Sequence, residues 1–141
     1  MRITFLCPHV RIAGGVRAIL TYADRLAARG HDVTLVVPAT SRVRAAWRNF
    51  RGGRPDWVPD FRARIRWVLH WTPEALPEGD VVVATAWQSA PAVAAAVDRL
   101  VPDVTRRVAY ACGGEPMIHR VRDVLVAKGL DRKSVKWEKF W

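Results

Sequence analysis

Residues 1–38 read MRITFLCPHVRIAGGVRAILTYADRLAARGHDVTLVVP, and this stretch decides the fold. Its first apolar run has no helical period and stops at Pro8, and a second such run occupies residues 33–37, so both are expected to be buried strands. Between them, apolar residues recur from Val16 at the spacing of an amphipathic helix until Arg29-Gly30, which supplies a cation and a stop. Strand, glycine turn, helix, tight turn and strand predict a βαβ unit with a right-handed crossover and a parallel sheet.

The rest of the chain continues the alternation of strands and helices. The expected elements are a short helix at 43–50 within a long excursion over 40–62, a peripheral strand at 64–69, a central strand at 80–85, a helix at 92–100, a fifth strand at 107–112 and a helix at 118–127. The strand at 80–85 is placed centrally because its continuous apolar run is typical of burial on both faces. We therefore expect an α/β fold with a Rossmann-like, doubly wound parallel sheet of about five strands in the order 3-2-1-4-5.

The composition is that of one globular domain without a membrane span. Half of the 141 residues are apolar, and no apolar run approaches the ~18 residues that cross a bilayer. The amino terminus lacks the charged start, long apolar stretch and cleavage site of a signal peptide, so a cytoplasmic protein is expected. Cys7 and Cys112 both lie in apolar, strand-like runs, which favours buried free thiols over a disulfide.

The positive charge of the chain is concentrated in one segment. The formal charge of +10 comes from 23 Lys and Arg against 13 Asp and Glu. Residues 40–71 hold eight Arg, two Asp and four of the seven tryptophans, namely Trp47, Trp57, Trp67 and Trp71. Interleaved basic and aromatic residues suit a polyanion or an anionic membrane surface. The alternative is an ordinary solvated face above buried core tryptophans.

The carboxyl-terminal residues differ from the rest of the chain in their choice of cation. Residues 1–127 contain eighteen Arg and no Lys, whereas residues 128–141 contain four Lys and one Arg. This change favours a tail of doubtful origin that did not evolve with the body, and an ordinary basic terminus is the alternative. We therefore expect one Rossmann-like domain over 1–127, and the tail is left out of the expected fold.

A glycine pair after the first strand is the strongest local signal for a site. Ligands of doubly wound sheets bind outside the carboxyl ends of the strands where the strand order reverses, here between the first and fourth strands. Gly14 and Gly15 allow close approach of a ligand, and the following helix presents free N–H groups to a phosphate. Arg11 and Arg17 flank the pair and suit bidentate phosphate contacts. A purely structural turn is the alternative, because neither Gly-x-Gly-x-x-Gly nor Gly-Lys-Ser/Thr is present.

Three further residues follow the fourth and fifth strands and are expected to face the same crevice. Glu115 can orient a hydroxyl or act as a base. The alternative is a structural acid near the start of the last helix, where the helix dipole stabilises its negative charge. Trp87 and Gln88 suit stacking on a sugar ring and hydrogen bonding to its hydroxyls, or else ordinary packing. His9 and His119 lie far apart in the sequence without the ligand spacing of a metal site, so no metal is expected.

Several stretches together resemble a known family. They are Met1–Leu6, Gly14-Gly15-Val16-Arg17 and Ala23–Val36, with looser matches at 80–87, 107–110 and Glu115-Pro116. In order and spacing they resemble the amino-terminal, acceptor-side domain of GT-B glycosyltransferases of the family 4-like group. The later pieces are similar to the rhamnosyltransferase-like branch.

The resemblance implies a nucleotide-sugar-dependent enzyme that transfers a hexosyl or deoxyhexosyl group to a cell-envelope glycan or lipid-linked acceptor. In that family the glycine loop approaches the donor diphosphate, which maps onto Gly14 and Gly15, and a carboxyl-terminal domain binds most of the donor. Many members carry a histidine after the fifth strand, where this chain has Cys112-Gly113-Gly114 and Glu115 is the nearest polar substitute. The nucleotide sugar is a substrate, and no tightly bound cofactor is expected.

Because the donor-binding domain is missing from these residues, we expect the chain to be inactive alone. It is expected in the cytoplasm, with peripheral contact at the inner face of the membrane through residues 40–71. The alternative is a stand-alone α/β binding module that uses residues 40–71 for a polyanion or an anionic membrane, a nucleic acid not being the expected partner. A fragment without a function of its own is the third alternative.

Overall fold

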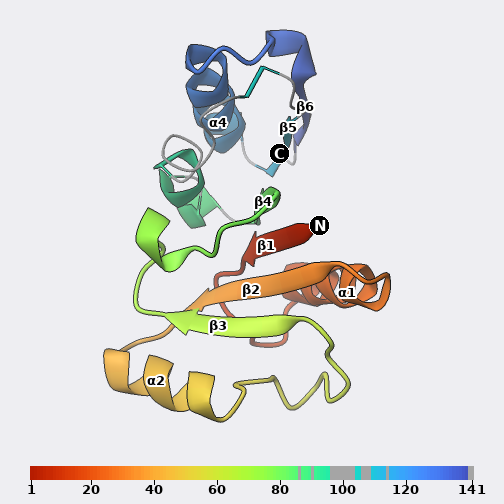
Figure 1. Ribbon diagram of the computed structural model, residues 1–141, viewed down its shortest axis with the longest axis vertical. Helices are drawn as coiled ribbons and strands as arrows, with labels where there is room; N and C mark the ends of the chain where they lie inside the picture. The colour runs from red at the N-terminus through yellow and green to blue at the C-terminus, as the bar shows by residue number, and fades with distance from the viewer. Residues whose placement is uncertain (86, 90, 96–103, 106–108, 114, 140–141) are drawn as a thin grey trace.

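Strands and helices alternate along the chain in the computed structural model, which describes residues 1–85, 87–89, 91–95, 104–105, 109–113 and 115–139 (Figure 1). The helices are α1 (Gly14–Ala28), α2 (Arg42–Phe50) and α4 (Glu115–Ala127), and residues 91–95 are also helical. The strands are β1 (Arg2–Leu6), β2 (Asp32–Pro38), β3 (Arg64–Val68), β4 (Val81–Ala84), β5 (Ala109–Gly113) and β6 (Val135–Lys139). Short 3-10 turns lie at η1 (Pro73–Ala75), η2 (Trp87–Ser89) and η3 (Arg132–Ser134).

Four parallel strands form the main sheet, in the order β3-β2-β1-β4. β1 pairs with β2 from Arg2↔Asp32 to Leu6↔Val36, and α1 connects these two strands. Gly30 follows α1 with a φ of 85°, a left-handed conformation that residues with a side chain rarely adopt. The α/β class and the strand order 3-2-1-4 that the sequence predicts are confirmed.

Successive side chains of a strand point to opposite faces of the sheet, so the continuous apolar runs place apolar groups on both faces. Both faces of the main sheet are accordingly covered. One face packs against α1, whose Leu20 is buried together with Phe5 and Leu35. The other face carries Leu6 and Val36. It packs against a set of residues from β3, from the turn near η1 and from the helical residues 91–95: Val68, Leu76, Ala92 and Val93. This double coverage is the layering expected of a doubly wound sheet.

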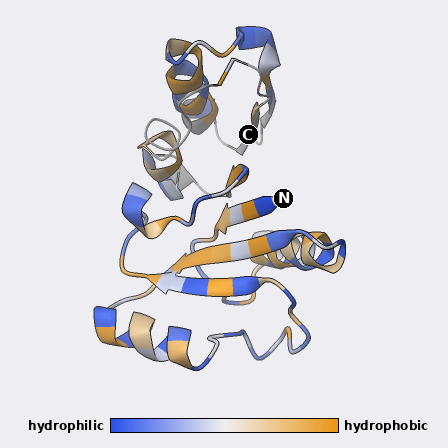
Figure 2. Ribbon diagram, viewed as in Figure 1, coloured by the Kyte–Doolittle hydropathy of each residue, from blue (hydrophilic) through white to orange (hydrophobic). Residues whose placement is uncertain are grey.

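β3 forms one edge of the main sheet, as its alternation of charged and apolar residues predicts. Figure 2 shows this alternation as blue and orange segments along the strand. Trp67 is buried in the core, and Arg64 forms an ion pair with Asp32 of β2. The adjoining helix α2 begins after Ser41, whose hydroxyl accepts a hydrogen bond from the backbone N–H of Arg44 at 3.2 Å. The helix predicted at 43–50 is therefore confirmed.

β4 does not occupy the central, doubly buried position that its sequence predicts. Within the described residues it has one strand neighbour, β1, and it lies at the edge of the main sheet with half-buried residues. β5 pairs instead with β6, so the fifth position of the expected order 3-2-1-4-5 is not confirmed. Central strands and partly covered edge strands share the same apolar run, so the sequence of β4 did not distinguish them.

The Lys-rich tail contributes a strand to the fold, although its composition sets it apart from the body. β6 runs parallel to β5, and Leu130 and Val135 are buried beside Ile118 and Leu125 of α4. β5, α4 and β6 thus form a second βαβ unit with its own small core, on the far side of β4 from β1 in Figure 1. Parts of the helix expected at 92–100 and of the strand expected at 107–112 lie outside the described residues.

Candidate functional site

The carboxyl ends of β1 and β4 lie side by side. Their register ends at Leu6↔Ala84, and the hydroxyl of Thr85 donates a hydrogen bond to the carbonyl oxygen of Leu6 at 2.6 Å. The loop after β1 and the turn η2 after β4 therefore start from neighbouring positions at the carboxyl ends of the main-sheet strands. This is the place that the sequence predicts for a ligand, between the first and fourth strands.

The loop after β1 begins with a residue that continues the sheet. The N–H of Cys7 donates to the carbonyl oxygen of Val36 at 3.1 Å, and its thiol donates to the carbonyl oxygen of His9 at 3.0 Å. Burial raises the pKa of the Cys7 thiol to about 11, against a smaller opposing effect of the His9 backbone. The thiol is therefore neutral at physiological pH, and its part is structural rather than nucleophilic.

Helix α1 starts in the loop after β1 without a side-chain cap. The position before the helix is Ala13, which makes no capping hydrogen bond, and the first turn holds no acidic residue. The first N–H groups of a helix have no partner within the helix and carry a partial positive charge. Gly14 and Gly15 are the first two residues of α1, so this open terminus lies where the sequence predicts a phosphate contact.

The structure gives no internal reason for glycine at these two positions. A Cβ atom added at Gly14 or Gly15 meets no atom within 4 Å, and neither residue has a positive φ. By contrast, Gly53 has a φ of 43° and an added Cβ there would lie 2.1 Å from Nε1 of Trp67. The purely structural turn that stood as the alternative therefore has no support in backbone strain or crowding at Gly14 and Gly15.

A cavity of about 490 Å³ lies along α1 between Arg17 and Arg25. Of the two arginines that the sequence predicts as phosphate contacts, Arg17 lines this cavity, whereas Arg11 is exposed in the preceding loop. The other lining residues are Ile12, Leu20, Thr21, Asp24, Arg25, Trp57 and Val58. The lining thus combines an aromatic ring and aliphatic groups with a carboxylate, a hydroxyl and two guanidinium groups.

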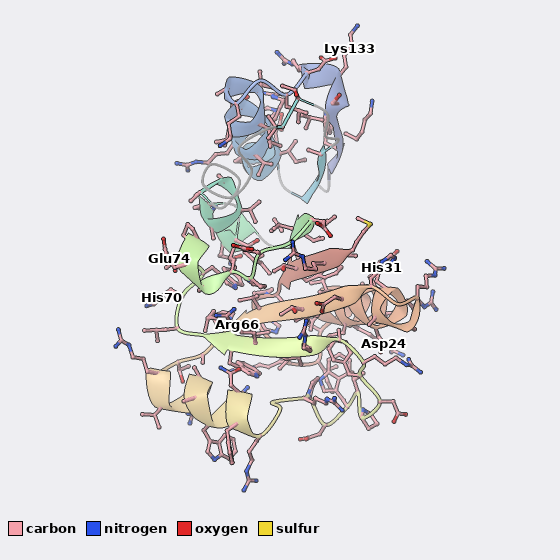
Figure 3. The ribbon with its side chains drawn as sticks, in the orientation of Figure 1. Asp24, His31, Arg66, His70, Glu74 and Lys133 are labelled. Carbon is pink, nitrogen blue, oxygen red and sulfur yellow. The ribbon has the colours of Figure 1, made fainter. Side chains whose placement is uncertain are left out.

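Two contacts hold residues 54–62 in place as one side of this cavity. The indole Nε1 of Trp57 donates to the carbonyl oxygen of Val10 at 3.0 Å. The backbone N–H and the guanidinium of Arg62 donate to the carboxylate of Asp24, at 2.9 and 3.0 Å (Asp24 is labelled in Figure 3). No feature of the sequence marked Asp24 as a site residue, and Trp57 was expected only as part of the basic segment 40–71. Both contacts join residues far apart in the chain, so no local pattern signals them.

The predicted residues after β4 lie close to the end of β1 in the fold. Trp87 and Gln88 belong to the turn η2, and Gln88 is exposed. Ser89, the last residue of this turn, is fully buried. Gln88 thus presents an exposed side chain after the carboxyl end of β4.

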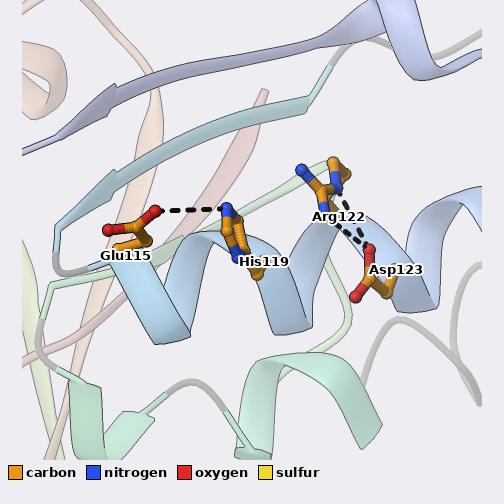
Figure 4. A network of polar contacts seen from close by, with 4 residues as sticks. All are labelled: Glu115, His119, Arg122 and Asp123. Carbon is orange, nitrogen blue, oxygen red and sulfur yellow. Dashed lines mark hydrogen bonds and ion pairs between the residues drawn. The ribbon is translucent and has the colours of Figure 1, made fainter.

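Glu115 lies in the second βαβ unit rather than on the main sheet. It is the first residue of α4, and its carboxylate lies 3.9 Å from Nε2 of His119, while Arg122 and Asp123 form a second ion pair on the same helix at 3.0 Å (Figure 4). Since β5 pairs with β6, strand pairing does not carry Glu115 to the edge where Gly14 and Gly15 lie. Glu115 therefore belongs to the helix of the β5-β6 unit, whereas Gly14, Gly15, Trp87 and Gln88 follow strands of the main sheet.

Over the described residues, no three His, Cys, Asp or Glu side chains gather as metal ligands would, and no helix is long and apolar enough to cross a membrane. Comparison with protein-family models, curated proteins and solved structures finds no match to this chain.

Proposed function

We propose that the chain is the amino-terminal, acceptor-side domain of a nucleotide-sugar-dependent GT-B glycosyltransferase. The observation that carries the proposal is the open amino terminus of α1, where Gly14 and Gly15 follow β1 without a cap, a crowding neighbour or a positive φ. Such a terminus favours a negatively charged group and lets it come close to the backbone. In the proposed enzyme this group is the diphosphate of the donor.

The cavity beside α1 supports the acceptor side of the proposal. Trp57 contributes an aromatic ring to its lining, the group on which the apolar side of a sugar stacks, and Asp24 and Thr21 contribute polar atoms. Thr21 donates to the carbonyl oxygen of Arg17 at 2.8 Å, which leaves the oxygen of its hydroxyl able to accept. The expected reaction is transfer of a hexosyl or deoxyhexosyl group to a glycan or lipid-linked acceptor in the cytoplasm, once a second domain completes the donor site.

The role of Glu115 in this function depends on that completion. Its carboxylate lies 3.9 Å from Nε2 of His119, and an exposed carboxylate at the start of a helix can orient a hydroxyl or act as a base. We therefore propose Glu115 as the candidate catalytic carboxylate.

An amide-resolved NMR titration of the ¹⁵N-labelled chain with uridine diphosphate and deoxythymidine diphosphate tests the proposal. Glycine amides fall in their own region of the spectrum, so Gly14 and Gly15 can be followed directly. We expect both to shift with diphosphate, while Gly52 and Gly129, which lie in other loops, stay in place. Uridine without phosphate is the matched control ligand. Unmoved Gly14 and Gly15 amides at ligand concentrations of about 10 mM, well above weak millimolar binding, would overturn the diphosphate assignment.

A further inference from the structure

Helix α2 lies along β3 at the edge of the main sheet and is held there by polar contacts (Figure 1). Asn49 donates from Nδ2 to the carbonyl oxygen of Trp67 at 2.9 Å and accepts from the N–H of Trp67 at 2.8 Å. The guanidinium carbon of Arg48 lies 4.1 Å from the centre of the Trp67 ring, and Ala45 is the buried residue of the helix. These contacts fix which side of α2 faces the protein.

The opposite side of α2 carries large apolar side chains in water. Val43, Trp47 and Phe50 are 79%, 57% and 90% exposed. Their spacing of four and three residues places them within about 60° of one another on a helix, roughly opposite Ala45. An apolar stripe at this angle has no neighbour in the described structure that would cover it.

The segment that carries this stripe is rich in arginine and lacks acidic residues. Between Pro38 and Asp56 the chain has five arginines and no acid: Arg42, Arg44, Arg48, Arg51 and Arg54. β3, on which α2 packs, adds Arg66, whereas the charge of its Arg64 is paired with Asp32 of β2 (Arg66 is labelled in Figure 3).

Arginine and apolar side chains also meet directly on this surface. The guanidinium of Arg51 lies 5.1 Å from the centre of the Trp47 ring. A depression of about 410 Å³ is lined by Val43, Arg44, Trp47 and Arg48, so apolar and cationic groups share one surface.

We propose that α2 docks the protein on an anionic lipid surface. Val43, Trp47 and Phe50 enter the boundary between headgroups and acyl chains, and the flanking arginines bind lipid phosphates. An anionic bilayer binds both parts of this surface, because its phosphates pair with the arginines and its acyl chains accept the apolar side chains. A nucleic acid backbone would pair with the arginines and leave Val43 and Phe50 in water. A second copy of α2 is disfavoured because two helices with the same excess of arginine repel each other. The inference does not depend on the proposed glycosyl transfer.

Cosedimentation with vesicles tests the proposal on the full chain. We expect binding to phosphatidylcholine vesicles that contain one third phosphatidylglycerol, falling as salt is raised, and no binding to phosphatidylcholine alone. The double substitution Trp47→Ser and Phe50→Ser should weaken binding at least tenfold because it removes the apolar insertion. Arg42→Gln with Arg44→Gln should weaken it about 25-fold, from roughly fivefold for each arginine near the surface.

A matched control removes the same charge elsewhere. Arg120 and Arg132 are exposed on the second βαβ unit, and their replacement by Gln should change vesicle binding less than about threefold. Circular dichroism confirms the fold of each variant. If the Trp47 and Phe50 variant loses its helical signal, the arginine pair and its control decide the outcome.

Four results would overturn the proposal. The first is absence of binding to the anionic vesicles, and the second is equal weakening of binding by the Arg120 and Arg132 control. The third is tighter binding to a single-stranded oligonucleotide than to the vesicles at the same salt. The fourth is a dimer in solution that the Trp47 and Phe50 substitutions dissociate. The third result would identify a nucleic acid surface, and the fourth an interface between copies. None of them alters the expected diphosphate shifts of Gly14 and Gly15, so this inference and the proposed function fail separately.

Discussion

Substitution of Gly15 should separate folding from ligand binding, because the structure leaves room for a side chain there. An added Cβ meets no atom within 4 Å and the residue has no positive φ, so Gly15→Ala should fold. Replacing a helical glycine with alanine reduces the entropy of the unfolded chain and stabilises the fold by about 0.5–1 kcal/mol. At roughly 2–4 °C per kcal/mol for a domain near this size, the Tm should rise by about 1–4 °C.

Gly15→Asp should also fold and should abolish diphosphate binding. A carboxylate in the first turn of α1 gains about 0.3–1 kcal/mol from the helix dipole, so the variant should be at least as stable as the parent chain. The same carboxylate placed about 5 Å from one phosphate charge costs about 3 kcal/mol at an effective dielectric constant near 20. That cost corresponds to an affinity loss of more than about a hundredfold.

Thermal unfolding by circular dichroism and NMR titration with uridine diphosphate measure the two effects on the same samples. The expected result is a Tm that stays level or rises in both variants, with diphosphate shifts retained in part by Gly15→Ala and lost in Gly15→Asp. Gly14→Ala is the neighbouring control, since it also occupies open space. A lower Tm in both Gly15 variants would show that the fold requires glycine. A Gly15→Asp chain that binds diphosphate as well as the parent does would refute the phosphate contact.

Three further predictions concern the stability of the main sheet. Asn49→Ala removes both hydrogen bonds to the backbone of Trp67 and should lower the free energy of unfolding in urea by about 2 kcal/mol; a loss below about 0.5 kcal/mol would show that α2 does not depend on them. Gly53→Ala should destabilise the protein more than Gly52→Ala, because only at Gly53 does an added Cβ meet Trp67, and equal Tm values for the two variants would contradict this. The pKa of Cys7 is raised in the folded state from 9.0 to about 11, so the unfolded chain releases its proton first and stability falls as pH rises through this range. The stability advantage of the parent chain over Cys7→Ala should therefore shrink between pH 9 and 11, by no more than about 1.4 kcal/mol per pH unit, and a constant difference would contradict the raised pKa.

The elements of residues 1–38 were predictable because each is specified within its own segment. Pro8 and Pro38 end the two apolar runs, helical spacing from Val16 defines α1, and Gly30 supplies the left-handed turn after it. The edge position of β3 was likewise readable, because its charged residues alternate with apolar ones. These signals depend on neighbours in sequence, which a single chain displays.

The partner of a strand is decided between distant segments, and the expected place of the fifth strand beside the fourth is not confirmed. The apolar run of β4 indicates a strand but not which neighbours it takes, and β5 took β6 as its partner. The lysine content of the tail did not predict its place in the fold, since Leu130 and Val135 lie between lysines and are nevertheless buried. Burial of a segment depends on a few apolar positions within it and not on its overall composition.

The candidate site divides in the same way. Gly14, Gly15 and Arg17 lie at the start of α1 as predicted, because the glycine pair and the helix are encoded side by side. Trp57 and Asp24 join the cavity only through the placement of residues 54–62, which contact residues 47 and 38 positions earlier in the chain. A long excursion of this kind carries no periodic pattern, so its course follows from tertiary contacts alone.

The position of β1 between β2 and β4 also sets a schedule for the growing polypeptide. β2 ends at residue 38 and can pair with β1 early, whereas β4 ends only at residue 84. The contact between β1 and the start of β4 includes two hydrogen bonds, from the N–H of Asp80 to the carbonyl oxygen of Arg2 and from the N–H of Arg2 to the Asp80 carboxylate. At about 5–20 residues per second, a ribosome takes roughly 2–9 s to make the intervening segment. During that interval one edge of β1 has no strand to meet, so the nascent chain passes through a stage in which its first strand can pair with the wrong neighbour.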